Sequence, residues 1–439
     1  MACRDEVVYD LRDRIRKDRT RHSILDSSRT NRGEMERGWS RVALLFVACL
    51  CTVPVTISQV SPDHPSTDRV TAPPPSSYAG DAACAQCHRK ESEFYALTPH
   101  ARDSGLANAK NIIGSFSQGH NVLHTANPNL VVNMLAQPDG FYQSAVNLAD
   151  QSRLAERFDI VIGSGRHGQS YLYWQDDLLY EMPASYWTWN HEWVISPGFP
   201  AGQIHFDRAI VPRCLECHAS YFTSMAPPQN RFQRDSLVLG INCERCHGPA
   251  AQHVARERSA AIPHSEKHDE TIVNPARLAR DRQLDLCALC HAGAVEPTRP
   301  PLTFEAGDNI HDYLAIPPPT PDAPPDVHGN QVGALEQSKC FTSSKMTCST
   351  CHNVHEKQEN ADAFSRHCLS CHEMKACGRY VALGSRIRTK CVDCHMPMLE
   401  SAKITSDSKE GTLHALLRAH QIKIYREASD TVERSLIGK

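Results

Sequence analysis

The sequence lacks an apolar run long enough for a typical membrane-spanning helix. Its apolar stretch Val42–Ile57 contains only sixteen residues, whereas a helix needs about 20 to cross the hydrocarbon core of a bilayer. The length instead suits the hydrophobic region of a secretory signal, which has positive charge in front of it, here Arg37 and Arg41. The stretch therefore predicts export from the cytoplasm, to a periplasmic or other extracytoplasmic location.

A clear processing site is also missing. No Ala-x-Ala sequence follows the apolar stretch, and the residues before Cys49 match a lipoprotein signal poorly. A cleaved signal peptide, an uncleaved membrane anchor and a lipid anchor all stay open. Residues 1–41 carry 11 basic and 8 acidic side chains, which is unusual for a signal peptide, so Met35 is a candidate start of translation. We assign residues 1–58 to this extension and its signal or anchor, and the Pro/Ser-rich residues 59–77 to an extended linker.

The chain has no excess of positive charge. Its formal net charge is −3, and beyond residue 41 it carries 36 basic and 42 acidic side chains. This balance argues against nucleic acid as a partner. The apolar content of 41% also lies slightly below the roughly 45–50% of ordinary globular domains. Part of the core is therefore expected to come from something other than side chains.

One pentapeptide, Cys-x-x-Cys-His, is present in abundance. Seven copies occur, three of them within the 48 residues from Cys348 to His395, whereas roughly 0.05 copies would arise by chance. This pentapeptide is the attachment signal for c-type haem. Its two thiols bond to the vinyl groups of one haem, and its histidine becomes the proximal ligand of the iron. The sequence therefore predicts seven covalently attached haems c and a multihaem cytochrome c.

We number the motifs first to seventh in chain order. Their attachment cysteines are Cys84 and Cys87, Cys214 and Cys217, Cys243 and Cys246, Cys287 and Cys290, Cys348 and Cys351, Cys368 and Cys371, and Cys391 and Cys394. The corresponding proximal ligands are His88, His218, His247, His291, His352, His372 and His395.

Structural zinc and disulfides explain this pattern less well. Zinc sites gather four ligands from two half-sites, and their chemistry does not require a histidine directly after every second cysteine. A disulfide within Cys-x-x-Cys is strained and easily reduced. Covalent haem is the interpretation that accounts for the whole pentapeptide.

The haem spacing predicts one body instead of several domains. The motifs span residues 84–395, or about 45 residues for each haem, which is too few for separate cores. We therefore expect a multihaem body over residues 78–430 that is mainly α, with much irregular structure around a covalent multihaem core. Its haem-dense part, residues 214–395, is expected to be helical.

The 125 residues between the first and second motifs have a different pattern. Apolar alternation in Leu130–Ala136 and Phe141–Leu148, on either side of Gln-Pro-Asp-Gly, predicts a β-hairpin. Further strands are expected at Phe158–Gly163, Tyr171–Trp174 and Leu178–Met182. Residues 120–195 thus read as an antiparallel β insertion. It either shields a haem edge or shapes a substrate pocket or partner-docking surface.

The distal ligands decide what each iron does. A haem iron with two protein ligands is a six-coordinate electron carrier, whereas one with a single protein ligand is open for chemistry. His22 and His64 lie outside the predicted body, which leaves 15 histidines for seven irons. The stronger distal candidates are His100, His253, His355, His414 and His420, and the weaker ones are His124, His167 and His205. Residues Leu413–Ala428 are expected to form a terminal helix that carries His414 and His420.

Two further compositional features leave alternatives open. Arginine outnumbers lysine by 34 to 13, which indicates either guanidinium binding to haem propionates or a GC-rich genome. Cys340 and Cys377 belong to no motif, so they form either a disulfide with each other or two unreactive thiols; Cys340 could alternatively lie over a haem.

Several segments resemble a known family. The segments YAGDAACAQCH, TPHARDS, GINCERCHGPAAQHV, MTCSTCHNVH and CVDCHMPM, with a trailing Leu-His-x5-His, are similar to the bacterial multihaem cytochromes related to the tetrahaem carriers of ammonia oxidisers. Within this group the chain resembles the doubled-CxxCH cytochromes, which are often fused to tetratricopeptide repeats, more closely than the tetrahaem carriers. The similarity extends from about Tyr78 to Tyr425 and includes RFDIVIGSGRHGQSYLYW and IVNPARLARDRQLDLC. It implies distal ligation by His100, His253 and His355; no repeat array follows in this sequence.

Three functions are compatible with these motifs. The first is an electron carrier whose closely packed haems exchange electrons with redox partner proteins of unknown identity. The second is an oxidoreductase that acts on a small nitrogen or sulfur compound at one open haem. Multihaem nitrite reductases often mark such a site with Cys-x-x-Cys-Lys, and all seven motifs here end in histidine. The third is a structural unit of a surface electron conduit. We favour the carrier.

Overall fold

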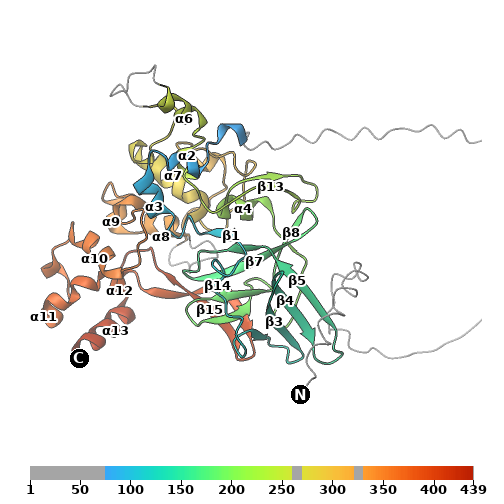
Figure 1. The fold of residues 1–439 in the computed structure, drawn as a ribbon. Coiled ribbons are helices and arrows are strands. Elements are labelled where there is room, and N and C mark those ends of the chain that lie inside the picture. Colours follow the sequence, from blue (N-terminus) through green and yellow to red (C-terminus); the bar gives the residue numbers. More distant parts are fainter. Residues whose placement is uncertain (1–74, 260–268, 321–329, 439) are drawn as a thin grey trace, which may run out of the picture.

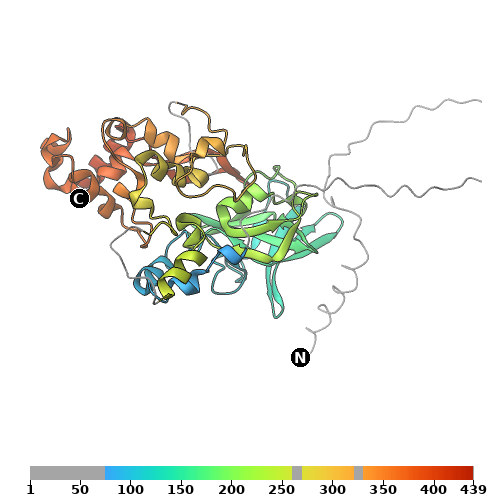
Figure 2. The same ribbon diagram turned by 90° about the horizontal axis from the view of Figure 1, so that it is seen from above.

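The computed structural model describes residues 75–259, 269–320 and 330–438. The extension 1–58 and nearly all of the linker 59–77 lie outside these ranges, as does part of the proline-rich segment 317–325. In both ribbon views the helices gather on one side of the molecule and the sheets on the other (Figures 1 and 2).

The strands are all short to medium in length. They are β1 (Ser104–Leu106), β2 (Val122–His124), β3 (Leu130–Gln137), β4 (Gly140–Asn147), β5 (Arg153–Phe158), β6 (Ile160–Ile162), β7 (Gly168–Gln175), β8 (Leu178–Glu181), β9 (Ala184–Trp187), β10 (Glu192–Ile195), β11 (Arg208–Ala209), β12 (Ala219–Ser224), β13 (Phe232–Leu239), β14 (Met398–Ser408) and β15 (Gly411–Arg418).

The α-helices are also short. They are α2 (Asp81–Cys84), α3 (Arg89–Tyr95), α4 (Pro212–His218), α5 (Glu244–His247), α6 (Ala251–Arg258), α7 (Arg280–His291), α8 (Gln331–Glu336), α9 (Lys339–Thr342), α10 (Ala361–Leu369), α11 (Tyr380–Leu383), α12 (Cys391–His395) and α13 (Arg426–Ile437). The 3-10 turns are η1 (Pro75–Ser77), η2 (Pro275–Arg277), η3 (Ile310–Asp312), η4 (Cys348–Thr350), η5 (Met374–Ala376) and η6 (Gly384–Thr389).

Two antiparallel sheets enclose the main hydrophobic core. One is a four-stranded meander in the order β2-β3-β4-β5, and the other is seven-stranded, with the path β1-β6-β7-β8-β11 and with β9 and β10 added beside β7. Alternate residues of β3, among them Val132 and Met134, are fully buried, and they pack in one cluster with Phe158, Tyr171 and Trp193. Strand alternation therefore places one face of each sheet in this core.

The helical side is joined to the sheets by the C-terminal hairpin β14–β15. The Asp407 carboxylate at its tip accepts a hydrogen bond of 2.7 Å from the backbone N–H of Gly202. The Ser406 hydroxyl donates a hydrogen bond of 2.8 Å to the carbonyl of Ile195 in β10. The hairpin thus fixes the last motifs relative to the seven-stranded sheet.

The expectation of a mainly α protein is wrong. About 30% of the described residues are helical and 26% are in strands, which form several antiparallel sheets. The motifs do form helical turns, and α3 follows the first motif directly, but strands follow the second and seventh motifs. The second motif, for example, passes directly from α4 into β12, where Ala219–Phe222 is fully buried. A continuous buried run of this kind suits a core strand as well as a helix.

The terminal helix expected over Leu413–Ala428 is also wrong. Residues Gly411–Arg418 form β15 and pair with β14 in the register Ser408↔Gly411 to Met398↔Arg418, and α13 begins only at Arg426. The two-residue connection at Lys409 and Glu410 closes a hairpin. Pairing with β14, which begins at Met398 just after the seventh motif, overrides the helical propensity of the leucines and alanines.

Among the described residues, none of the helices has the length and apolarity of a bilayer-spanning segment.

One carboxyl group in the meander predicts a pH-dependent stability. Burial raises the pKa of Glu156 in β5 to about 6, from an ordinary value of 4.5. The folded state therefore favours the protonated form, so this contribution to stability is complete below pH 4.5 and is lost as the pH rises through about 6. Glu156→Gln is expected to raise Tm at pH 8 and to change it little at pH 4.5. Thermal unfolding at both pH values checks this; an equal gain at both would contradict it, and Glu400→Gln, at an exposed position, is the control.

Candidate haem-binding site

All seven motifs open into one cavity. Its volume is about 2920 Å³, and its lining includes both cysteines and the histidine of every motif. The motifs are spread over more than 300 residues of sequence, from Cys84 to His395. Their convergence on one cavity is the central feature of the site.

A single helical turn gives each motif its shape. The backbone N–H of the motif histidine donates to the carbonyl of the first cysteine, at 2.8 Å for His88 and Cys84 and 2.9 Å for His352 and Cys348. This i to i+4 hydrogen bond is the repeat of the α-helix. It puts the two thiols and the imidazole on one side of the turn, as attachment to one haem requires.

Four proximal imidazoles face a second imidazole across the cavity. The ring centres are 6.5 Å apart for His88 and His253, 6.0 Å for His247 and His355, 6.4 Å for His352 and His420, and 6.1 Å for His100 and His291. The first three pairs have nearly parallel rings, with interplanar angles of 24°, 30° and 22°, whereas the fourth pair is at 75°.

These separations fit a metal between the rings. A metal lies about 2.0–2.1 Å from a bound imidazole nitrogen, so two rings on opposite sides of it have centres roughly 6 Å apart. Rings in direct stacking contact would approach to about 3.5–4.0 Å between carbon atoms. The observed pairs are therefore held apart by about the distance that a bis-imidazole haem iron needs.

Burial keeps several of these imidazoles neutral. It lowers the pKa of His291 and of His352 to about 4. Burial also lowers the pKa of His100, His247 and His420. Because only a neutral imidazole nitrogen can bind a metal, the site favours the ligating form at neutral pH.

The other ring nitrogen of many of these histidines is already hydrogen bonded. The Nδ1 atoms of His247, His395 and His420 lie 2.9, 2.9 and 3.0 Å from the backbone carbonyl oxygens of Val273, Lys423 and Arg418. The Nδ1 atom of His253 lies 2.7 Å from the Asp269 carboxylate. Such partners orient a ligating ring and leave Nε2 free for the metal.

The proximal histidine of the second motif also has a carboxylate partner. His218 Nδ1 lies 2.7 Å from a carboxylate oxygen of Asp103. Burial opposes a charge on this imidazole, but the Asp103 carboxylate more than offsets burial and raises the pKa of His218. A carboxylate acceptor also raises the basicity of a ligating imidazole.

Asp103→Asn is expected to raise the reduction potential of the haem at the second motif. A more basic ligand stabilises ferric iron, and loss of the carboxylate removes this effect. A 10- to 100-fold change corresponds to roughly 60–120 mV for one electron. Spectropotentiometric titration of wild type and variant checks the shift, and Asp139→Asn in the meander is the control. An unchanged set of midpoint potentials would contradict the prediction.

The remaining distal candidates differ in whether they line the cavity. His167 lines the cavity from the β6–β7 connection. His124 is exposed on β2, and His205 contacts Gln203. His414 lies on β15 with its Nδ1 atom 2.9 Å from the Ser401 carbonyl oxygen. Within the described ranges, the last three are not among the residues that line the cavity.

Not every proximal histidine faces another imidazole. Over the part of the chain that the structure describes, His218, His372 and His395 form no ring pair with a second histidine. His367, which precedes the sixth motif, packs against Phe364 instead. The last three motifs thus borrow one opposing imidazole, His420, from the segment after β15.

Cys340 and Cys377 are free thiols. Both line the cavity. Of the alternatives that the sequence left open, the structure therefore argues against the Cys340–Cys377 disulfide.

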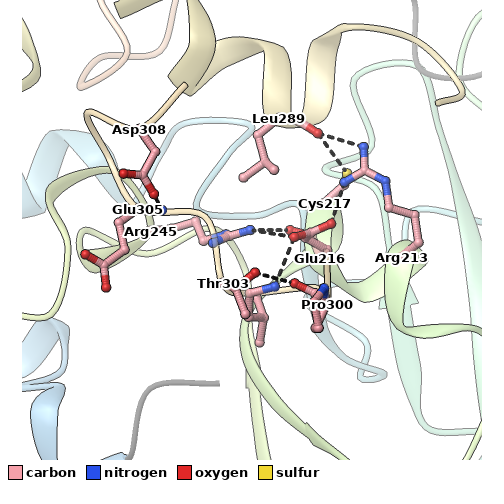
Figure 3. A network of polar contacts seen from close by, with 10 residues as sticks. Arg213, Glu216, Cys217, Arg245, Leu289, Pro300, Thr303, Glu305 and Asp308 are labelled. Carbon is pink, nitrogen blue, oxygen red and sulfur yellow. Dashed lines mark hydrogen bonds and ion pairs between the residues drawn. The ribbon is translucent and has the colours of Figure 1, made fainter. Parts of the chain in front are cut away.

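The residues between the motif cysteines have a role that the sequence pattern did not indicate. Glu216 of the second motif is 3% exposed and accepts a 2.6 Å hydrogen bond from Arg213. Its other carboxylate oxygen accepts from the backbone N–H of Leu302 and lies 3.9 Å from Arg245 of the third motif. Figure 3 shows this buried network, in which Arg213 also reaches the carbonyl of Leu289 in the fourth motif.

Glu244 of the third motif has a similar function. It is 6% exposed, and its carboxylate accepts hydrogen bonds from the backbone N–H groups of Ala79, Gly80 and Ala250. The chain segment that leads into the first motif is thereby fixed to the third. A charged residue in the variable position of a CxxCH motif was the available sequence signal for both glutamates.

Arg245 provides a direct test of whether the cavity fits haem. Its side chain is 7% exposed and lines the cavity, and its Nε–H has no hydrogen-bond acceptor among the described residues. A buried guanidinium donor without a partner is costly. A haem propionate is the kind of carboxylate that would satisfy it. The donor, the thiols and the paired imidazoles all fit covalent haem.

Comparison with known families agrees with this geometry. A family model described as "Cytochrome c554 and c-prime" matches residues 201–248, which contain the second and third motifs. Together with the seven motifs and the cavity, this match supports a multihaem c-type cytochrome, a class of haem-binding proteins that transfer electrons. No curated protein matches the sequence.

Two solved cytochrome structures show partial similarity to this chain. The structure titled "Crystal Structure of Outer Cell Wall Cytochrome OcwA" shares 14% sequence identity over 81% of each chain, with a TM-score of 0.49. An undecahaem cytochrome from the S-layer of Carboxydothermus ferrireducens shares 16% identity over 74% of this chain and 52% of that chain, with a TM-score of 0.37.

Proposed function

We propose that this chain carries seven covalent haems c, most of them with two axial imidazoles, and that it transfers electrons through them outside the cytoplasm. The four opposed imidazole pairs, at 6.0 to 6.5 Å, are the observation that carries the proposal. They involve the first, third, fourth and fifth motifs. The opposing rings are His253, His355, His100 and His420, all of them distal candidates from the sequence.

The chemistry of a bis-imidazole haem suits a carrier. With both axial positions filled by protein, the iron exchanges electrons and has no position for a substrate. Redox partner proteins reduce and reoxidise the haems. The CxxCH chemistry and the apolar stretch Val42–Ile57, which lies outside the described residues, support an extracytoplasmic location.

Haem counting and electron paramagnetic resonance test the proposal. Pyridine haemochrome analysis of the purified holoprotein is expected to give seven haems per chain. The ferric protein is expected to show mainly low-spin bis-imidazole signals, with at least four haems of this type. A count well below seven, or a spectrum dominated by high-spin haem, would overturn it.

One observation favours a second function, an oxidoreductase at one open haem. His218 of the second motif faces no second imidazole within the described residues, and polar side chains of the seven-stranded sheet line the cavity near it. Glu181 of β8 forms a 3.2 Å ion pair with Arg208 of β11 and interacts electrostatically with His218. Burial raises the pKa of Glu181. A guanidinium and a carboxyl group beside an open iron suit a small nitrogen or sulfur compound.

Ligand binding separates the two functions. Addition of nitrite or hydroxylamine to the ferric holoprotein is expected to convert a high-spin signal to low spin if the second haem is open. Arg208→Gln is then expected to weaken nitrite binding, whereas Arg234→Gln, on the exposed part of β13, is not. If neither compound changes the spectrum, the oxidoreductase function is excluded and the carrier function remains.

A further inference from the structure

The sixth motif is one of two that are exposed at the surface. Of the attachment cysteines, all of which lie in the described ranges, only Cys87 of the first motif and Cys371 of the sixth are exposed. The histidines of these two motifs, His88 and His372, are exposed as well. In both ribbon views α10, which contains Cys368 of the sixth motif, and α11 lie at the end of the molecule away from the sheets (Figures 1 and 2). A partner protein can therefore approach the sixth motif from outside.

The outer surface around the sixth motif is basic. Residues 361–395 carry six basic and three acidic side chains, although the chain beyond residue 41 has fewer basic side chains than acidic ones. Four of the six basic residues are exposed and form no ion pair with any other described residue. We call these four the basic surface: Arg366, Lys375, Arg386 and Arg388. The only exposed carboxylate of the same described segment is Glu373, so the basic surface keeps a net positive charge.

The elements that carry the basic surface pack together. The turn η6, which contains Arg386 and Arg388, contacts both α10, which contains Arg366, and η5, which contains Lys375. The neighbouring helix α13 does not offset this charge, because its exposed charged side chains are Arg426, Glu427 and Arg434. The four cations of the basic surface therefore belong to one region of the molecule.

The basic surface faces away from the haem cavity. Ile387 lines the cavity and is 8% exposed, whereas Arg386 and Arg388 on either side of it are not among the lining residues. Lys375 likewise does not line the cavity, although both of its neighbours in sequence do. This alternation directs the apolar side chain inward and the cations outward.

Different cations line the cavity at this end. Arg379 and Lys390 are both among the lining residues. Arg379 is paired with Asp430 and Glu433, and Lys390 with Asp393. Arg379 and Lys390 are therefore the cations that a haem propionate inside the cavity would meet. The basic surface lies outside the lining and is available to a partner.

The first motif, the other exposed one, lacks such a surface. The helix that follows it, α3, has four exposed charged side chains, two basic and two acidic: Arg89, Lys90, Glu91 and Glu93. Arg89 and Glu93 also form a 3.2 Å ion pair with each other. These charges cancel, so the two exposed motifs differ in that only the sixth is surrounded by positive charge.

We propose that the basic surface is the docking site of an acidic redox protein that exchanges electrons with the sixth haem. The inference rests on the proposed seven-haem carrier. Complementary charge steers the two proteins together and raises the association rate. Val381 of α11, which is 98% exposed, supplies an apolar contact beside the cations. One electron passes between the iron of the sixth haem and the redox centre of the docked protein, so that one is oxidised as the other is reduced, and no atoms are transferred.

Reduction of the ferric holoprotein by an acidic probe tests the docking site. The probe is reduced plant-type ferredoxin, an acidic iron–sulfur protein whose potential of about −400 mV favours electron transfer to a haem. Stopped-flow absorbance measures the second-order rate constant of haem reduction at ionic strengths of about 0.01 and 0.15 M, between which the Debye length falls from about 30 to about 8 Å. The rate constant is expected to fall about 10-fold or more as salt is added. A rate constant that rises with salt would mean that the acidic molecule as a whole repels the probe, and the proposal would be wrong.

Two matched charge reversals locate the effect. Lys375→Glu combined with Arg388→Glu alters two exposed side chains that form no ion pair or hydrogen bond with the other described residues. This double variant is expected to lower the rate constant at low salt about 10-fold or more, and to change it little at high salt. Lys90→Glu combined with Lys110→Glu changes the net charge by the same amount at exposed positions elsewhere and is expected to change the rate constant less than about 2-fold. An equal loss in both double variants would overturn the docking site.

Further measurements separate the docking site from the carrier. Photoreduced riboflavin, a small reductant that needs no docking, is expected to reduce the wild type and both double variants at the same rate. If riboflavin leaves most haems of the wild type oxidised, or if pyridine haemochrome analysis gives well below seven haems, the proposed carrier itself fails. If Lys375→Glu with Arg388→Glu loses binding to vesicles of phosphatidylserine and phosphatidylcholine but keeps its rate constant with ferredoxin, the basic surface contacts a membrane, and the docking proposal is wrong.

Discussion

Replacing His253 by alanine is expected to convert one low-spin haem into a high-spin haem. The His253 ring lies parallel to that of His88, with ring centres 6.5 Å apart, and its Nδ1 atom lies 2.7 Å from Asp269. Loss of this imidazole leaves the iron of the first motif with one protein ligand. Electron paramagnetic resonance of the ferric holoprotein is expected to lose one low-spin component and to gain a high-spin signal that exogenous imidazole removes.

His124→Ala is the matched control for this substitution. His124 was also a distal candidate from the sequence, but it is exposed on β2 and, within the described ranges, lies outside the cavity lining. Its removal is expected to leave the spectrum unchanged. If both variants retain all low-spin components, the His88–His253 pair is not an axial pair, and the distance argument fails for this motif.

The sequence predicts the covalent chemistry better than it predicts the fold. A CxxCH pentapeptide is local, because one helical turn is enough to gather its two thiols and its imidazole, as the hydrogen bond from His88 to Cys84 shows. The seven motifs and their convergence were therefore accessible without a structure. The pairing of His352 with His420, by contrast, depends on a chain reversal 68 residues long that has no local signal.

The helix content was overestimated for a physical reason. Helical turns at the motifs are fixed by haem attachment and say little about the flanking residues. Ala219–Phe222 and Gly411–Arg418 become strands because partner strands are available to them, β13 and β14. Such pairing is a tertiary effect, and apolar runs of this length do not reveal it.

The buried charges were missed because the motif pattern treats the residues between the cysteines as variable. Glu216 and Glu244 look like ordinary surface glutamates in sequence, yet both are nearly inaccessible. Each fixes a motif to a distant part of the chain through a carboxylate that accepts several hydrogen bonds. Buried acids of this kind are retained only where partners compensate them, so a glutamate inside a haem motif is a signal for an inter-motif contact.

Glu216→Gln is expected to destabilise the holoprotein by about 3–5 kcal/mol, the cost of removing one partner from a buried ion pair. Arg213 and Arg245, whose side chains are 18% and 7% exposed, would keep their charges without the carboxylate that compensates them. Guanidinium-induced unfolding, followed by the Soret band and by circular dichroism, measures the loss. The matched control is Glu93→Gln, which breaks an ion pair with Arg89 whose side chains are 70% and 84% exposed and is expected to cost less than about 1 kcal/mol.

A double variant separates charge compensation from packing. If the cost of Glu216→Gln arises from the uncompensated guanidiniums, then adding Arg213→Gln removes one of them, and the double variant is expected to lose less stability than the two single variants together. Strict additivity would mean that Glu216 acts through its shape alone. If Glu216→Gln lowers the free energy of unfolding no more than Glu93→Gln does, water reaches the Glu216 carboxylate. Another interaction would then have to hold the second, third and fourth motifs together.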